Sequence, residues 1–354
     1  MTATDTRRSG SAEPVAVRSA FTELSTWNAK ELYRDRKGSF SILFMFFFFF
    51  LLIIGLNFVV NYGNRPEPVV AVSGEQSAVD DVMSSLERAG IPASTSSDAA
   101  GDTDAVVVVD ADRAVIMLSS EDPPRWIALA SAVADTGYSS GDVVVVDDTG
   151  APQLDLLRSN LAGVAAIGFM AITFMGTAVP VVSLRQRGTL RLLGTTPVRK
   201  LTFIAAQTPV RFGLGAVVGA VVVAVAASLG YLDVAGTLRL IVTFVLGLLM
   251  FFSFAYLLAS RSRNAEIINQ ISVLVPVLAL FASGNVFPKD FLPDGVLVAL
   301  DVLPTTWFMQ AAGRDLTGTE GFASVYVLWA MMLGATVVVS ALAAKLFLWD
   351  DRER

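Results

Sequence analysis

Long runs of apolar residues dominate the chain and are separated by short polar segments. A hydrocarbon core of about 30 Å is crossed by about 20 apolar residues, because a helix rises about 1.5 Å per residue. Six stretches meet this requirement, at residues 40–62, 161–184, 212–229, 240–260, 267–287 and 325–348. The first lies too far into the chain and is too long for a cleavable signal peptide. The pattern predicts an α-helical polytopic membrane protein with six transmembrane helices.

Lysine and arginine residues gather beside alternate ends of these stretches. Basic residues near helix ends mark the cytoplasmic side of a membrane protein. They lie before the first stretch, between the second and third, between the fourth and fifth, and after the sixth: Arg34, Arg36 and Lys37; Arg185, Arg187, Arg191, Arg199 and Lys200; Arg261 and Arg263; Arg352 and Arg354. An even number of crossings puts all four groups on one side, so we expect both termini to be cytoplasmic.

Arg211 precedes the third stretch and raises a question of depth in the membrane. Residues 212–229 are uncharged and nearly long enough to span the membrane alone. We therefore expect Arg211 to lie at the cytoplasmic boundary and to snorkel toward water.

The segment 63–158 departs from the apolar pattern. Short β-branched runs at 69–72, 106–109, 115–118 and 143–146 alternate with helix-like stretches at 77–89 and 125–134. This alternation predicts a small extracytoplasmic α/β domain inserted between transmembrane helices 1 and 2. Its carboxylates account for the net charge of -6, and solvation of the domain explains them more simply than cation binding does.

Four regions follow from these patterns. Residues 1–38 are expected to form a cytoplasmic tail and an amphipathic interfacial helix, because Leu24, Trp27 and Tyr33 alternate with Lys30 and Arg34. A generic basic flank is the alternative interpretation of that helix. Residues 39–62 form transmembrane helix 1, residues 63–158 form the α/β domain, and residues 159–354 contain transmembrane helices 2–6.

Composition narrows the chemistry. Of 354 residues, 54% are hydrophobic and 16% are charged, too apolar for an ordinary soluble domain. The absence of Cys and His excludes disulfide frameworks, thiolate nucleophiles, imidazole bases and the usual zinc sites, so no catalytic or metal-binding residues are predicted. The acidic balance argues against nucleic acid as a partner. No Gly-x-x-x-x-Gly-Lys-Ser/Thr phosphate loop occurs in the sequence.

The most informative motif lies between the second and third stretches, in residues 184–198. Leu190 and Leu193 are three residues apart, which suits a short amphipathic helix, and Gly188 and Pro197 bracket it as helix breakers. A basic residue followed by Gly-Thr-Leu, further leucines and Thr-Pro-Val resembles the coupling helix of type-2 ATP-binding cassette (ABC) exporter permeases. The resemblance places this cytoplasmic helix near residues 186–197 and implies contact with an ATPase through Arg187, Gly188, Thr189, Leu190, Leu193, Thr196 and Pro197.

One position in the motif departs from the family. Many members carry Glu immediately before the basic residue, whereas this chain has Gln186. A charged contact with the ATPase at that position is therefore not expected.

A second match follows the fifth stretch, where Gly and Pro recur. It is similar to the external elements of the same family, in which Ser-Gly and Pro-containing turns form a re-entrant hairpin near residues 284–304. Irregular backbone is tolerated at membrane depth only beside protein or water partners. The resemblance implies an external gate formed by Ser283, Gly284, Pro288, Pro293 and Pro304.

Polar and aromatic residues within the apolar stretches are candidates for the substrate path, since such groups usually face a protein interior or cavity. The candidates are Asn57, Asn61, Thr173, Phe174, Asn269, Gln270 and Ser272. Alternatively, the hydroxyl groups bond to their own helices, the asparagines mark helix packing, and Phe174 faces lipid.

The resemblance implies a permease subunit in a bacterial plasma membrane, with no cofactor of its own. Two copies of a separate ATPase would bind ATP and Mg, and a second permease copy or a sister permease would complete the path within membrane lipid. The expected activity is export of a drug, natural product, lipid or lipid-linked glycan by alternating access. The alternatives are a sodium extrusion permease and a membrane sensor that uses the external domain.

Overall fold

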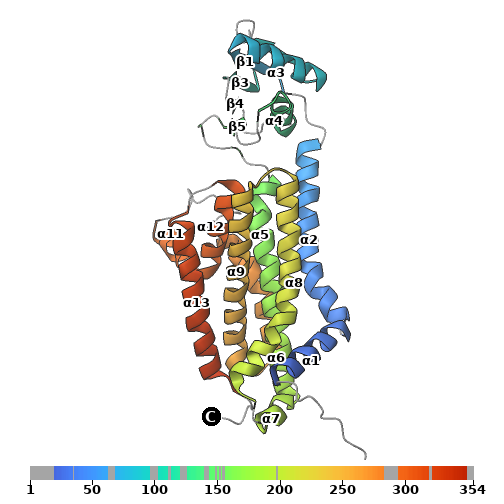
Figure 1. Ribbon diagram of the computed structural model, residues 1–354, viewed down its shortest axis with the longest axis vertical. Helices are drawn as coiled ribbons and strands as arrows, with labels where there is room; N and C mark the ends of the chain where they lie inside the picture. Colours follow the sequence, from blue (N-terminus) through green and yellow to red (C-terminus); the bar gives the residue numbers. More distant parts are fainter. Residues whose placement is uncertain are drawn as a thin grey trace, which may run out of the picture.

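A long helical bundle carries a small α/β unit at one end (Figure 1). The computed structural model describes residues 20–34, 36–62, 68–95, 103–110, 113–119, 126–138, 143–147, 150, 153, 156–196, 198–282, 294–318 and 321–348. The bundle and the α/β unit have separate hydrophobic cores.

The helices of the bundle follow the apolar stretches, with several additional short elements. They are α1 (Ala20–Arg34), α2 (Arg36–Tyr62), α5 (Leu156–Met170), the π-helix η1 (Ala171–Ala178), α6 (Val179–Gln186), α7 (Thr189–Gly194), α8 (Lys200–Ser228), α9 (Val234–Arg261), α10 (Ala265–Ala282), α11 (Asp294–Asp301), α12 (Pro304–Thr317) and α13 (Val325–Leu346).

Five helical segments within the described ranges are long and apolar enough to cross a membrane. They lie in α2, in the continuous run α5–η1–α6, and in α8, α9 and α13. The fifth predicted stretch corresponds to α10. Its apolar part, Ala265–Leu278, is shorter than the five candidate spans. A polytopic helical membrane protein is supported, and a total of six crossings stays a prediction.

The run α5–η1–α6 forms the centre of the bundle. Its most apolar window is 83% buried, against 17% for the windows in α2 and α13. Phe169 of α5 packs edge-to-face against Phe244 of α9 and Phe308 of α12, with ring centroids 5.3 and 5.8 Å away. This aromatic cluster joins three helices at the core.

The α/β unit contains a five-stranded sheet in the order β2-β1-β3-β4-β5. Its strands are β1 (Val70–Gly74), β2 (Ala93–Thr95), β3 (Ala105–Val109), β4 (Ala114–Leu118) and β5 (Val143–Val146), and its helices are α3 (Gln76–Arg88) and α4 (Trp126–Ala134). The β3–β4 pair is antiparallel, and the other neighbouring pairs are parallel.

Alternating burial along β3 and β4 places one face of the sheet in the core. Val107 and Ile116 lie opposite each other and are fully buried, whereas Val108 and Met117 are exposed. The bounds of four strands lie within two residues of the predicted β-branched runs. The short β2 was missed because Ala93 and Ser94 carry little strand signal.

Candidate coupling element and transmembrane sites

The short helix α7 lies at the end of the bundle opposite the α/β unit (Figure 1). Gly188 separates it from α6 in a left-handed conformation with φ of 74°, which a residue with a side chain adopts at a cost. The Gly188 N–H donates to the Arg185 carbonyl at 2.9 Å, which closes the end of α6. The motif glycine therefore produces the sharp change of direction between the two helices.

The side chains of α7 divide into an anchoring and an exposed set. Leu190 is fully buried in the bundle core, and Leu193 packs partly against it. Leu192 is 71% exposed, and Arg187, Arg191 and Thr196 are also exposed. Thr189 is half-buried, and Pro197 lies outside the described residues. Leu190 thus anchors the helix, while the exposed side chains are accessible to a partner.

Gln186, which replaces the family glutamate, has a local partner. Its side-chain Nε2 donates to the Arg263 carbonyl in the α9–α10 connection at 2.9 Å. An amide can donate this bond whereas a carboxylate cannot, so the departure from the family motif adds a tie between α6 and that connection.

The predicted substrate-path residues come from α2, η1 and α10, and η1 packs against both other helices. Thr173 and Ser272 are fully buried, and their hydroxyls donate to carbonyls of their own helices, at Phe169 and Ile268. Phe174 is buried and Asn57 is half-buried, whereas Asn269 and Gln270 are exposed. The side chain of Asn61 is not among those that the structure describes. The substrate path through these residues stays a prediction.

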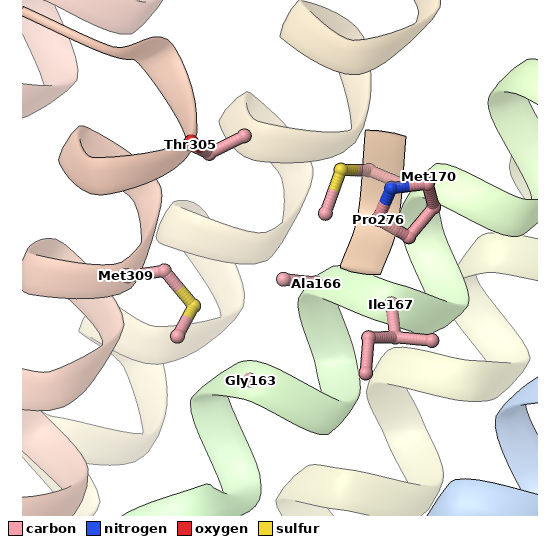
Figure 2. A pocket seen from close by; sticks show the side chains of 7 residues that line it. All are labelled: Gly163, Ala166, Ile167, Met170, Pro276, Thr305 and Met309. Atoms are coloured by element: carbon pink, nitrogen blue, oxygen red, sulfur yellow. The ribbon is translucent and has the colours of Figure 1, made fainter. Parts of the chain in front are cut away.

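An apolar pocket lies between α5, α10 and α12, and sequence reasoning did not identify it. Its lining consists of Gly163, Ala166, Ile167, Met170, Pro276, Thr305 and Met309. Figure 2 shows Met170 and Met309 reaching toward the pocket from opposite sides. The remaining space is too small for a water molecule, so the two flexible methionine side chains fill an irregular gap in the packing of the three helices.

Pro304, from the predicted external gate, adjoins this pocket through Thr305. It occupies the first turn of α12, where a missing N–H does not weaken a helix. Ser283, Gly284, Pro288 and Pro293 lie outside the described residues. The re-entrant hairpin stays a prediction.

The expectation that Arg211 snorkels toward water is wrong. Arg211 is only 6% exposed, because α8 begins eleven residues earlier, at Lys200, and carries Arg211 into the bundle. Its Nε donates to the Gly176 carbonyl of η1, and its Nη1 donates to the carbonyl and the side-chain Oε1 of Gln207. The side chain bonds to protein instead of snorkelling to water.

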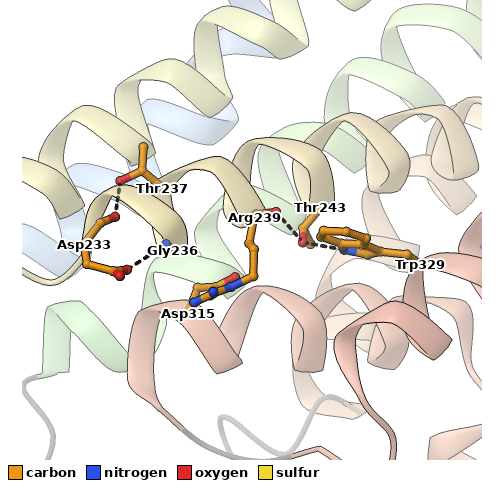
Figure 3. Close-up of polar contacts among 7 residues, drawn as sticks. All are labelled: Asp233, Gly236, Thr237, Arg239, Thr243, Asp315 and Trp329. Carbon is orange, nitrogen blue, oxygen red and sulfur yellow. Dashed lines mark hydrogen bonds and ion pairs between the residues drawn. The ribbon is translucent and has the colours of Figure 1, made fainter.

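A polar cluster joins α9, α12 and α13 (Figure 3). Arg239 Nε lies 2.7 Å from Asp315 Oδ1. The Arg239 side chain is 39% exposed, and the Asp315 side chain is fully buried. The Trp329 indole donates to the Thr243 hydroxyl at 2.9 Å, and that hydroxyl donates to the Arg239 carbonyl. Asp233 caps the start of α9 by accepting from the Gly236 N–H. These bonds hold three helices together near the beginning of α9.

The comparisons with known proteins agree with the motif in α6–α7. A family model described as ABC-2 family transporter protein matches residues 37–345. Comparison with curated proteins finds no match. The matched range includes the α/β unit and every bundle helix that is long and apolar enough to cross a membrane, apart from the outermost residues of α2 and α13. This multi-pass membrane protein therefore belongs to the ABC-2 transporter family, as the motif resemblance predicted.

Proposed function

We propose that the chain is the permease subunit of an ATP-driven exporter that moves a hydrophobic or amphipathic compound out of the cytoplasm or the inner leaflet. Members of the family are membrane components, generally without enzymatic activity, that work with an ATPase subunit. In this proposal two copies of that ATPase bind ATP and Mg at the cytoplasmic face of a bacterial plasma membrane. A drug, natural product, lipid or lipid-linked glycan is the proposed cargo.

The exposed surface of α7 carries the proposal. Leu192 is 71% exposed and lies on α7, at the tip of the bundle, where Leu190 anchors the helix. Arg187 and Arg191, close to it in the sequence, are also exposed. An exposed leucine beside basic side chains can supply an apolar centre with a polar rim to a protein interface. The arrangement suits docking of a cytoplasmic protein.

The apolar character of the spans supports the proposed cargo. The windows in α2 and α13 are only 17% buried within one chain, so most of their apolar surface is left for lipid and for a second permease copy. A path between two such copies would be lined by few charges. Movement through it requires that ATP binding favours one of two access states over the other.

Recovery of an ATPase with the tagged protein tests this function. The protein is purified from detergent-solubilised native membranes, and vanadate-sensitive ATP hydrolysis is measured in the eluate. We expect Leu192→Asp to reduce the recovered ATPase by about tenfold or more, since a loss of about 1.4 kcal/mol in binding suffices for that factor.

Leu229→Asp is the matched control. Leu229 is also an exposed leucine, at 48%. It directly follows the C-terminal end of α8, whereas α7 precedes the N-terminal end of α8. This variant should retain the ATPase. A folded parent protein that recovers no ATPase would contradict the proposed function, as would equal recovery by both variants.

A further inference from the structure

Arg185 occupies an unusual position just before the coupling element. It is only 4% exposed, although it lies one residue before the end of α6. Its guanidinium donates to the carbonyls of Ala259, Ser260 and Ser262 at 2.8, 3.1 and 2.6 Å, and to the Leu348 carbonyl at 3.0 Å. One side chain therefore bonds to the ends of two other helices.

These acceptors are the groups that helix ends leave without partners. The last carbonyls of a helix have no intrahelical donor, and a cation near them is favoured by the helix dipole. Ala259 and Ser260 lie in the last turn of α9, and Leu348 follows α13. Arg185 thus closes the C-terminal ends of α9 and α13 together.

Further contacts reinforce this junction. The guanidinium carbon of Arg185 lies 5.3 Å from the centre of the Phe347 ring, within the range of a cation–π interaction. Lys200 Nζ donates to the Phe347 carbonyl at 2.6 Å, and the Leu348 N–H donates to the Ser260 carbonyl at 3.2 Å. The start of α8 therefore joins the ends of α6, α9 and α13.

The packing of α7 makes this junction a mechanical link. Among the described elements, α6 is the only one against which α7 packs extensively. Arg185 is three residues before Gly188, so a displacement of α7 acts first on the turn that contains it. The ends of α9 and α13 are bonded to that turn through its side chain.

We propose that Arg185 is a positioning residue that transmits displacement of α7 to α9 and α13. The inference rests on the proposed function, because the displacement would come from the docked ATPase. Arg185 itself is buried and does not offer a surface to the partner. Its substitution should weaken transmission while leaving the docking surface intact.

Hydrogen–deuterium exchange measured by mass spectrometry tests the proposal on the full chain purified with its ATPase. In the parent complex, vanadate trapping with ATP should change exchange at residues 187–196 and also at residues 259–264 and 343–348. In Arg185→Gln the change at 187–196 should persist, and the changes at the other two segments should be lost. Arg185→Lys, which keeps the charge with fewer donors, should give a partial change.

Arg261→Gln is the matched control, because it removes an exposed arginine from the same end of α9. It should behave as the parent. Nucleotide-dependent changes at 259–264 and 343–348 that survive in Arg185→Gln would overturn the proposal. Faster exchange throughout the bundle, or loss of ATPase recovery in Arg185→Gln, would also overturn it, since the residue would then support the fold or the docking surface itself.

Failure of the proposed function remains distinguishable from failure of this inference. If the parent recovers no ATPase, exchange is compared without nucleotide. Faster exchange in Arg185→Gln confined to 187–196, 259–264 and 343–348 would then support the junction, and an unchanged profile would overturn it.

Discussion

Arg211 shows how a single guanidinium is held inside the bundle. Arg211 Nε donates to the Gly176 carbonyl of the π-helix η1, and the side-chain oxygen of Gln207 accepts from Nη1. The charge is thereby paired with acceptors on α8 and on η1, which compensates its burial.

Replacing Arg211 should destabilise the protein because these acceptors lose their donor. We expect Arg211→Leu to lower the free energy of unfolding by about 1–3 kcal/mol, the usual cost of an unsatisfied buried polar group. Arg261→Leu is the control, because Arg261 is exposed and its loss should change stability by about 0.5 kcal/mol or less. Denaturant unfolding in detergent micelles compares the two variants, and equal losses of stability would contradict the role assigned to the bonds of Arg211.

The ion pair of Arg239 and Asp315 predicts which of two substitutions destabilises the protein more. The Asp315 side chain is fully buried and its Oδ2 has no hydrogen-bond partner among the residues that the structure describes, whereas the Arg239 side chain is 39% exposed. Removing the arginine leaves a buried carboxylate, whereas removing the acid leaves a cation that can reach water. Arg239→Gln should therefore lower the unfolding temperature more than Asp315→Asn does. The reverse order would show that Asp315 is not charged in the folded protein.

Sequence reasoning found the residues of the coupling motif but not the roles of Arg211 and Arg185. The count of uncharged residues after Arg211 assumed that the helix starts there, and only the structure shows that α8 starts at Lys200. The acceptors of Arg185 lie at least 74 positions away in the sequence. Composition and spacing contain no signal for such long-range carbonyl partners.

At the scale of elements, close packing between α9 and α12 depends on Gly247. A Cβ atom built at this position would overlap the ring of Phe308. That ring is fully buried and is held between Phe169, Phe244 and Phe251. It has little space into which to move, because protein interiors are packed closely.

Gly247→Ala should therefore lower the free energy of unfolding by about 1–3 kcal/mol, as overpacking of a core does. Gly334→Ala in α13 is the matched control, because nothing lies within 4 Å of the added Cβ. This second variant should be neutral or more stable by about 0.5–1 kcal/mol, since Ala is the better helix former. Thermal unfolding in detergent compares the two, and equal effects would argue against tight packing at Gly247.

The predictability of the elements follows from their physical signals. Long apolar runs and β-branched runs reveal the long helices and four of the strands, because hydropathy and periodicity are local properties. The π-helix η1 and the helices α11 and α12 were not predicted. Thr173 and Gly176 have no local feature that distinguishes a π-helix from an α-helix, and Pro304 was interpreted as part of an irregular hairpin although it begins a helix.

At the scale of the whole molecule, the junction at Arg185 constrains how the chain crosses the membrane. The bond from Arg185 to the Leu348 carbonyl places the end of α6 beside the end of α13. Of the recognised spans, α8, α9 and α13 lie between these two points. An even number of crossings is needed to return to the same side, so we expect the segment containing α10 to make one further crossing.

Single cysteines labelled with a membrane-impermeant maleimide test this arrangement, and the chain has no native cysteine to remove. Glu87→Cys in α3, Leu192→Cys in α7 and Lys345→Cys in α13 all replace exposed residues. The α/β unit and α7 lie at opposite ends of the bundle (Figure 1). With basic loops on the cytoplasmic side, Glu87→Cys should react in spheroplasts, whereas Leu192→Cys and Lys345→Cys should react only after permeabilisation. Reaction of Lys345→Cys without permeabilisation would mean that α10 does not cross, and five crossings would then replace the predicted six.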